Sequence, residues 1–180
     1  WKKHDMKIVV ATLGIGAYWK GCKVLLRSLE QHGLPDTVDR VMLYDPVNTE
    51  VTSADFATMV PILDDYSDLP FPVKDESNPQ RFVNSFKRIF AFTLPYDRII
   101  YLDADMLCVG DPSLLWSEKI GKLPFYACRD TSAYKYYPQE LLAAGIDPQL
   151  VFNGGLEVYH PELLPSLYYD LLGRLRQGIL

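Results

Sequence analysis

Long apolar runs are absent from this sequence. No apolar stretch reaches the roughly 18 residues that a helix needs to cross a lipid bilayer. The amino-terminal residues also lack the charged, apolar and small-residue order of a secretory signal peptide. We therefore expect no membrane span in this chain.

An excess of basic residues is also missing. Lysine and arginine together number 18, against 23 aspartates and glutamates, which gives a formal net charge of −5. Proteins that bind nucleic acids usually carry a basic excess or a dense basic patch. We therefore expect no nucleic-acid partner, and an anionic ligand would need a metal ion or a few well-placed cations.

Cysteines are few. Cys22, Cys108 and Cys128 form an odd set without close spacing, which argues against a disulfide framework and against a zinc site. Such cysteine usage fits a reducing compartment. We expect a cytoplasmic protein, and a fragment of a Golgi-luminal protein is the alternative.

Apolar residues are plentiful enough to build a core. They make up 48% of the 180 residues, and charged residues make up 23%, as is typical of globular proteins. The length predicts a single domain over residues 1–180. The chain starts at Trp1 and stops on the apolar pair Ile179-Leu180. Because termini are usually polar and frayed, we expect this domain to be incomplete at its carboxyl-terminal end.

Strand patterns and helix patterns alternate along the chain. Short apolar and β-branched runs predict strands, whereas apolar residues that recur every three to four positions predict helices. The predicted strands cover residues 7–13, 40–44, 61–63, 98–102, 123–128 and 156–159. The predicted helices cover residues 18–32, 52–60, 82–94 and 161–175. This alternation indicates an α/β fold with a mostly parallel central sheet flanked by helices, in which ligands bind at the carboxyl ends of the strands.

Two carboxylates directly follow the strongest predicted strand. Asp103 and Asp105 stand two positions apart after residues 98–102. On an extended chain such side chains point to one side, where they repel each other unless a cation lies between them. Oxygen ligands suit Mg²⁺ or Mn²⁺, so we expect a metal site here. Two solvated acids at a strand exit are the alternative.

Two other protein classes share the Asp-x-Asp pattern. A calcium-binding EF-hand loop is excluded, because Leu107 and Cys108 occupy positions that require an acidic or amide residue and a glycine. Phosphatases with an aspartate nucleophile also place Asp-x-Asp at a strand end. They need a second acidic pair downstream, and no two acidic residues are adjacent after Asp105. The phosphatase hypothesis is therefore the weakest.

Five segments in a fixed order carry a resemblance to a known family. They are the strand Val9-Val10-Ala11-Thr12 followed by Tyr18-Trp19-Lys20-Gly21, the lysine Lys87, the strand end Tyr101-Leu102-Asp103-Ala104-Asp105, the segment Phe152-Asn153-Gly154-Gly155, and the end Arg176-Gln177-Gly178-Ile179-Leu180. In these motifs the chain resembles the glycogenin-like retaining enzymes of glycosyltransferase family 8, over nearly its whole length.

The resemblance implies a fold and an activity. It implies a single GT-A-like domain that binds a nucleotide-sugar donor, usually UDP-linked, together with Mn²⁺ or Mg²⁺. It also implies that a hexose passes to a carbohydrate or protein acceptor with retention of anomeric configuration. Because the residues offer no clear carboxylate nucleophile, we expect front-face attack in which the departing phosphate acts as the base.

The resemblance also implies roles for individual residues. The metal ligands would be Asp103 and Asp105. The catalytic residues would be Lys87, Asp130 and Gln177. The donor would contact Thr12, Tyr18, Lys87, Asp103, Ala104, Asp105, Asn153, Gly154 and Gly155. Lys87 would be a point charge for the diphosphate or the donor sugar, and Asp130 and Asn153 would hydrogen-bond the sugar hydroxyls.

The chain departs from the family pattern near its end. Arg176 stands where the family has an aspartate, and the segment before it is shorter, so residues are expected to be missing there. The family's third metal ligand is a histidine expected beyond residue 180. These departures support a second hypothesis, a relative or fragment that binds a nucleotide-sugar without turnover.

A long stretch separates the last two predicted strands. Residues 131–151 contain Tyr134, Tyr136 and Tyr137, and aromatic rings suit the apolar faces of sugars. One hypothesis is an acceptor-side lid. A packed surface excursion or an oligomer contact is an equal alternative.

Overall fold

The computed structural model describes residues 6–47, 49, 56–64, 66, 84–120, 123–129 and 152–177. Three predicted features lie outside the described residues. They are Asp130, the proposed lid at 131–151, and the end of the last motif at 178–180.

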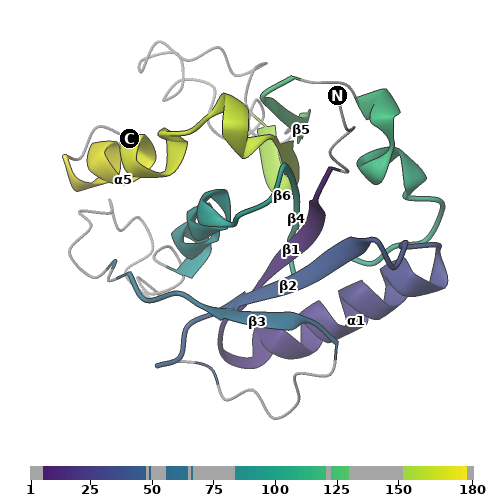
Figure 1. The fold of residues 1–180 in the computed structure, drawn as a ribbon. Coiled ribbons are helices and arrows are strands. Elements are labelled where there is room, and N and C mark those ends of the chain that lie inside the picture. The colour runs from purple at the N-terminus through teal and green to yellow at the C-terminus, as the bar shows by residue number, and fades with distance from the viewer. Residues whose placement is uncertain are drawn as a thin grey trace.

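A six-stranded sheet forms the centre of the described part of the chain (Figure 1). Its strands are β1 Ile8–Gly14, β2 Val38–Tyr44, β3 Thr58–Pro61, β4 Arg98–Leu102, β5 Phe125–Arg129 and β6 Phe152–Tyr159. They lie in the order β3-β2-β1-β4-β6-β5. The pairs β3–β2, β2–β1 and β1–β4 are parallel, whereas β6 runs antiparallel to both β4 and β5. The expected mostly parallel sheet is confirmed.

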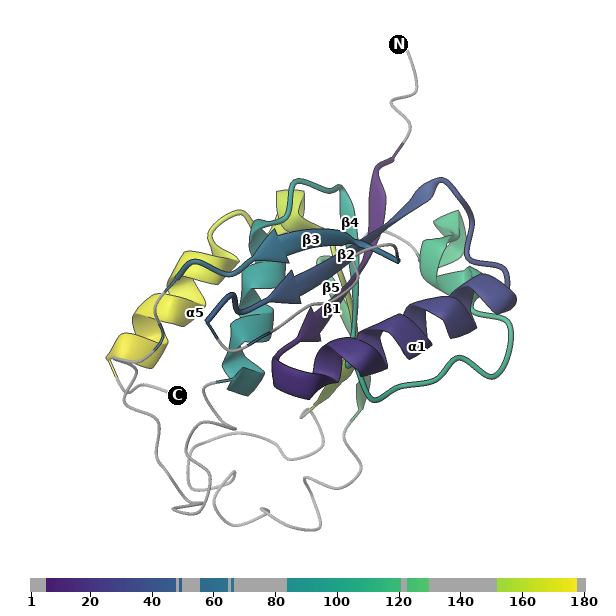
Figure 2. The same cartoon turned by 90° about the horizontal axis from the view of Figure 1, so that it is seen from below.

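Helices cover both faces of this sheet (Figure 2). The α-helices are α1 Trp19–Gln31 and α5 Leu167–Arg176. Shorter 3₁₀ segments are η1 Gly16–Tyr18, η2 Lys87–Thr93, η3 Ser113–Trp116, η4 Glu118–Ile120 and η6 Pro161–Leu163. The helix α1 packs on one face together with η3, and η2 and α5 pack on the other face.

Strand β4 shows how the sequence builds the two faces. All five of its residues are buried, because successive side chains of a strand point to opposite faces and both faces are covered. Ile99 and Tyr101 face the cluster that contains η2 and α5. Ile100 and Leu102 face the cluster that contains α1. The prediction of this strand is confirmed at residues 98–102.

The boundary between the predicted helix at 52–60 and the predicted strand at 61–63 is wrong. A helix was expected over residues 52–60, yet the structure places Thr58–Pro61 in strand β3. Val60 pairs with Leu43 of the parallel strand β2, and the Ile62 N–H donates to the Tyr44 carbonyl at 2.8 Å. The hydrogen bonds of this segment to β2 outweigh its short helical pattern, because strand preference depends on context more than helix preference does.

The carboxyl-terminal strand is longer than its pattern predicted. A strand was expected at 156–159, and β6 begins four residues earlier at Phe152. The four added residues, Phe152 to Gly155, include two glycines, which weaken the strand signal in a sequence. Within the described residues, no helix is both long enough and apolar enough to cross a membrane.

Candidate functional site

The antiparallel pairing of β4 and β6 brings two distant motifs together. Leu102, the last residue of β4, pairs with Leu156 of β6. The next residue, Asp103, donates its backbone N–H to the Gly155 carbonyl at 2.9 Å. The start of β6 therefore lies beside the exit of β4, at the sheet edge where ligands bind in such folds.

Asn153 and the two glycines form an irregular stretch of strand β6 at this end of the sheet. The Asn153 Oδ1 accepts a hydrogen bond from the Gly155 N–H at 2.7 Å. A Cβ added at Gly155 would lie 2.9 Å from that Oδ1 and 3.5 Å from the Asp103 Oδ2. A side chain at Gly155 would therefore crowd the Asn153 side chain and come into contact with Asp103. Three residues that the sequence predicted for donor binding meet here.

Arg88 joins this cluster and was not predicted. Its Nη1 donates to the Gly154 carbonyl at 3.0 Å and lies 3.8 Å from the Asp103 Oδ1. A Cβ at Gly154 would stand 2.2 Å from the same Nη1, so the guanidinium occupies the space that the glycine leaves open. The only sequence signal was its place beside Lys87 in a segment predicted as helix.

The acids of the cluster are held in a setting that disfavours negative charge. Burial raises the pKa of Asp103, and the negative charge of Asp105 raises it further. The Arg88 guanidinium and a hydrogen bond from Tyr101 lower that pKa and partly offset the rise. Burial also raises the pKa of Glu157, to about 7, with Arg88 opposing and Asp103 adding to the shift. An added cation would relieve this accumulation of acids.

The two predicted metal ligands fit a hard divalent cation in donor type and in charge. Asp103 and Asp105 both offer carboxylate oxygens, which Mg²⁺ and Mn²⁺ prefer. The Asp103 side chain is 39% exposed and Asp105 is exposed, so both can meet a ligand from solvent. The described part of the chain holds no group of three or more acidic, histidine or cysteine side chains arranged for a metal. The assignment of Asp103 and Asp105 as metal ligands stays a prediction.

Lys87 forms an ion pair with Asp45. It is only 8% exposed, and its Nζ lies 2.5 Å from the Asp45 Oδ2, which is also buried. The second Asp45 oxygen accepts the Val47 N–H at 2.9 Å. The structure thus places Lys87 in a buried ion pair at the end of β2.

The remaining predicted donor contacts lie around the start of α1. Tyr18 is 64% exposed and directly precedes α1. A Cβ on Gly21 would come within 2.4 Å of the Ala104 carbonyl oxygen, so the helix lies against the Asp103–Asp105 segment. Thr12 is buried, and its hydroxyl donates a hydrogen bond to the Cys22 sulfur at 3.6 Å.

Gln177 directly follows the last residue of α5. It is exposed, and its N–H donates to the Gly173 carbonyl at 3.2 Å as the last turn of α5 closes. No contact between its side chain and the Asp103 cluster is described among these residues. Its predicted catalytic role stays a prediction, as does that of Asp130.

His160 has both ring nitrogens engaged. Arg98 donates from Nε to its Nε2 at 3.2 Å, so the opposite nitrogen carries the proton and donates to the Leu123 carbonyl at 2.9 Å. The residue is buried. His160 therefore has a structural role between β4 and the chain before β5.

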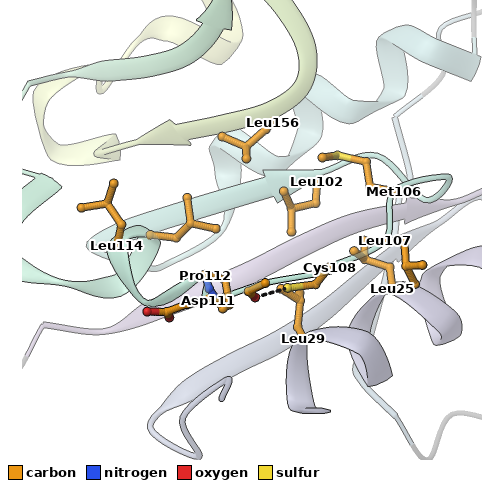
Figure 3. Close-up of a pocket in the computed structure, with 12 residues that line it drawn as sticks. Leu25, Leu29, Leu102, Met106, Leu107, Cys108, Asp111, Pro112, Leu114 and Leu156 are labelled. Carbon is orange, nitrogen blue, oxygen red and sulfur yellow. Dashed lines mark hydrogen bonds between the residues drawn. The ribbon is translucent and has the colours of Figure 1, made fainter. Parts of the chain in front are cut away.

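A separate hollow lies on the α1 face, behind the Asp103–Asp105 segment (Figure 3). Its volume is about 370 Å³, and it opens between α1, the end of β4 and the chain from Met106 to Leu115. Nearly all of its lining is apolar, and Asp111 is its one charged lining residue. Such a lining does not suit a nucleoside diphosphate, so the polar cluster is the better candidate for a donor site.

Comparison with known proteins gives one family. The family model described as glycosyl transferase family 8 matches residues 16–164. No curated protein sequence matches the chain significantly.

Several solved structures share the fold at low sequence identity. A galactosyltransferase, LgtC, solved with donor and acceptor sugar analogues, is 14% identical with a TM-score of 0.64, over 93% of this chain and 66% of that one. The glycosyltransferase GlyE of Streptococcus pneumoniae is 16% identical with a TM-score of 0.55, over 97% and 38%. Mouse xyloside xylosyltransferase 1 is 16% identical with a TM-score of 0.57, over 96% and 74%. The chain thus spans less than two thirds of LgtC and of GlyE.

Proposed function

The chain belongs to glycosyl transferase family 8, and from this premise we propose that it transfers a hexose from a UDP-linked donor to a carbohydrate or protein acceptor. The transfer uses a divalent cation, Mn²⁺ or Mg²⁺, and retains the anomeric configuration of the sugar. The likeness to a galactosyltransferase solved with donor and acceptor analogues supports a hexosyl donor.

One observation carries the proposal. Asp103, the Asn153–Gly155 segment of β6 and Arg88 meet at the carboxyl end of β4. A carboxylate that is partly desolvated beside a cation and an amide provides groups for a metal ion, a phosphate and sugar hydroxyls. The apolar hollow on the α1 face has Asp111 as its one charged lining residue and no cation among the residues described around it.

Each residue has a proposed task. Asp103 and Asp105 would hold the cation, which when bound would neutralise the charge that develops on the leaving UDP. Asn153 would hydrogen-bond a sugar hydroxyl. Gly154 and Gly155 would leave room for the Arg88 guanidinium and the Asn153 amide beside the sugar. Tyr18 would offer an exposed ring to the uracil.

The proposed transfer is a front-face substitution. The acceptor hydroxyl attacks the anomeric carbon, the bond from that carbon to the phosphate oxygen breaks, and the hydroxyl proton passes to that oxygen of the departing UDP. Glu157 is not proposed as a nucleophile, because it is buried and burial raises its pKa to about 7.

A binding measurement tests this proposal. Calorimetric titration of the chain with UDP should give affinity that depends on Mn²⁺, and Asp105→Asn should abolish that dependence because it removes a charged ligand. The conservative control is Asp111→Asn, an exposed acid in the segment after the metal motif. Absence of UDP binding in the presence of Mn²⁺ would refute the proposal, and unchanged affinity in Asp105→Asn would refute the metal assignment.

A second assay separates a transferase from a binding protein. Arg176 in place of the family's aspartate favours a chain that holds the donor without turnover. Release of hexose from UDP-glucose or UDP-galactose, followed with and without Mn²⁺, distinguishes the two. Binding without release would support the non-catalytic relative.

A further inference from the structure

We propose that the buried pair of Arg98 and His160 is a proton-sensitive latch. It holds the chain that leads from η3 to β5 on the sheet while His160 is uncharged, and it releases that chain when His160 takes up a proton. The inference goes beyond the proposed function and does not depend on it, because the pair lies at the amino-terminal end of β4, whereas Asp103 follows the carboxyl end.

The antiparallel pairing of β4 and β6 brings the two side chains together. Arg98 is the first residue of β4, and His160 directly follows β6, where Ile99 pairs with Tyr159. Arg98 is 2% exposed and His160 is 3% exposed. The Arg98 Nε donates a hydrogen bond to the His160 Nε2 at 3.2 Å. The contact between them is therefore shielded from water.

The pair holds both ends of the chain between η3 and β5. At the end of η3, the Arg98 Nη1 donates to the Ser117 carbonyl at 2.9 Å. Just before β5, the His160 Nδ1 donates to the Leu123 carbonyl at 2.9 Å, and the His160 backbone N–H donates to the Pro124 carbonyl at 3.1 Å. Loss of the contact between Arg98 and His160 would therefore loosen both attachments.

A proton on the His160 Nε2 would break this contact. A guanidinium has N–H donors and no acceptor, so Nε2 must accept from it as an uncharged nitrogen. Protonation turns that acceptor into a donor and places two cations side by side, at a site where burial already lowers the pKa of Arg98. Because arginine stays charged near neutral pH, the two side chains must separate when His160 is charged.

Other titratable groups lie near the pair among the residues described. Glu118 of η4 and Tyr126 of β5 raise the pKa of Arg98 and partly offset the effect of burial. Glu162 of η6 follows close after His160 in the sequence and is exposed, as is Glu118. Both ring nitrogens of His160 are already bonded. These acids therefore act on the ring through space, and solvent screens the exposed ones.

The direction of the pH dependence follows from proton uptake. A histidine in an open chain takes up a proton near pH 6.5, whereas the closed latch needs His160 uncharged. The open form thus binds more protons at low pH, so the stability of the latch is full above about pH 6.5 and is lost as the pH falls below it. At pH 5.5 the open form should be about tenfold more populated than at pH 7.5.

Hydrogen exchange followed by mass spectrometry tests the latch on the 180-residue chain. Peptides from residues 112–124 are compared between the parent and His160→Gln, because glutamine offers Arg98 an acceptor and cannot take up a proton. These peptides have the same sequence in both proteins, so their intrinsic exchange rates cancel in the ratio, as do effects of other titrating groups. The ratio of parent to variant rates should rise about tenfold from pH 7.5 to pH 5.5. Peptides of α1 should keep a constant ratio.

His32→Gln is the matched control. His32 is exposed at the end of α1, and a ring nitrogen lies 2.7 Å from the Ser28 carbonyl, which a charged ring can still contact as a donor. This variant should keep the pH dependence of the parent. A ratio for residues 112–124 that does not change with pH overturns the inference. An equal rise for α1 peptides also overturns it, in favour of acid unfolding of the whole chain.

A second measurement needs no variant and serves if His160→Gln does not fold. Nuclear magnetic resonance of the ring nitrogens of the parent at pH 6 should show His160 uncharged, with its proton on Nδ1. A charged His160 ring in a chain whose residues 112–124 remain protected from exchange overturns the inference. Neither result bears on UDP binding, so the proposed function is tested separately.

Discussion

Two adjacent cations show how far the role of a residue depends on its partners. Lys87 and Arg88 are neighbours in the sequence, yet one is buried against Asp45 and the other lies half-exposed against Asp103. The burial of the lysine is tolerated only because its charge is paired and hydrogen-bonded. Removing one partner should therefore cost more than removing both.

A mutant cycle tests this pairing. Lys87→Met should lower the free energy of unfolding by about 3–5 kcal/mol, because it leaves the Asp45 charge buried and unpaired. The double variant Lys87→Met with Asp45→Leu should recover most of that loss. Urea unfolding followed by circular dichroism gives both values.

Lys119→Met is the control for this cycle, because Lys119 is exposed in η4. It should change stability by less than about 0.5 kcal/mol, as surface substitutions usually do. A cost of under about 1 kcal/mol for Lys87→Met would contradict the buried pairing.

The sequence identified part of the site and missed part of it. Asp103, Asp105 and the Asn153–Gly155 segment were predicted from motifs, and the structure places Asp103 against that segment. The contact of Arg88 with Asp103 and Gly154 was not predicted. It joins residues that are distant in sequence, since 66 positions separate Arg88 from Gly154, and a local sequence pattern does not report such contacts.

At the scale of elements, the contact between α1 and the exit of β4 positions the proposed metal ligands. Gly21 on α1 lies so close to the Ala104 carbonyl that a Cβ would stand 2.4 Å from its oxygen. Glycine usually weakens a helix interior. Here the close approach of α1 to Ala104 explains why a glycine stands at position 21, and α1 packs directly against the Asp103–Asp105 segment.

A pair of glycine substitutions tests this packing of α1 against Ala104. Gly21→Ala should destabilise the protein, because overpacking costs about 1–3 kcal/mol and exceeds the roughly 1 kcal/mol that alanine adds to a helix. Gly173→Ala in α5 should instead stabilise by about 0.5–1 kcal/mol, because nothing lies within 4 Å of the added Cβ. Thermal unfolding of both variants measures the difference, and a Gly21→Ala variant as stable as Gly173→Ala would show that α1 is free to shift.

The elements that the sequence predicted well are those buried on both sides. The strand at 98–102 was predicted at its exact bounds, since all of its residues are apolar or enclosed. The segment 52–60 was predicted as helix and is partly strand β3. Strand β3 lies at the edge of the sheet, beside β2. It is short and only partly buried, and such a segment carries little periodic signal.

At the scale of the whole molecule, the two faces of the sheet hold separate apolar clusters. Cys22 belongs to the α1 cluster and is fully buried. Burial raises the pKa of its thiol to about 11. Cys128, in contrast, is exposed, and all three cysteines are free thiols.

Thiol labelling therefore reports on the integrity of the α1 face. At pH 8 and without denaturant, Cys128 should react rapidly with iodoacetamide, whereas Cys22 should not, because its thiolate is scarce and its sulfur is enclosed. Labelling of Cys22 should follow the urea unfolding transition. Mass spectrometry of peptides gives the site, and rapid native labelling of Cys22 would contradict the packing of α1.

The pairing of β4 with β6 has a consequence for folding order. The contacts of Arg88 and Asp103 with Gly154 and Gly155 of β6 close a long loop of chain, and the entropy of that closure must be met before the contacts form. Helix α1 and strands β1 and β2 are consecutive along the chain and close shorter loops. The proposed donor site therefore forms only after β6 pairs with β4, and a ligand that binds there would stabilise the folded chain by mass action.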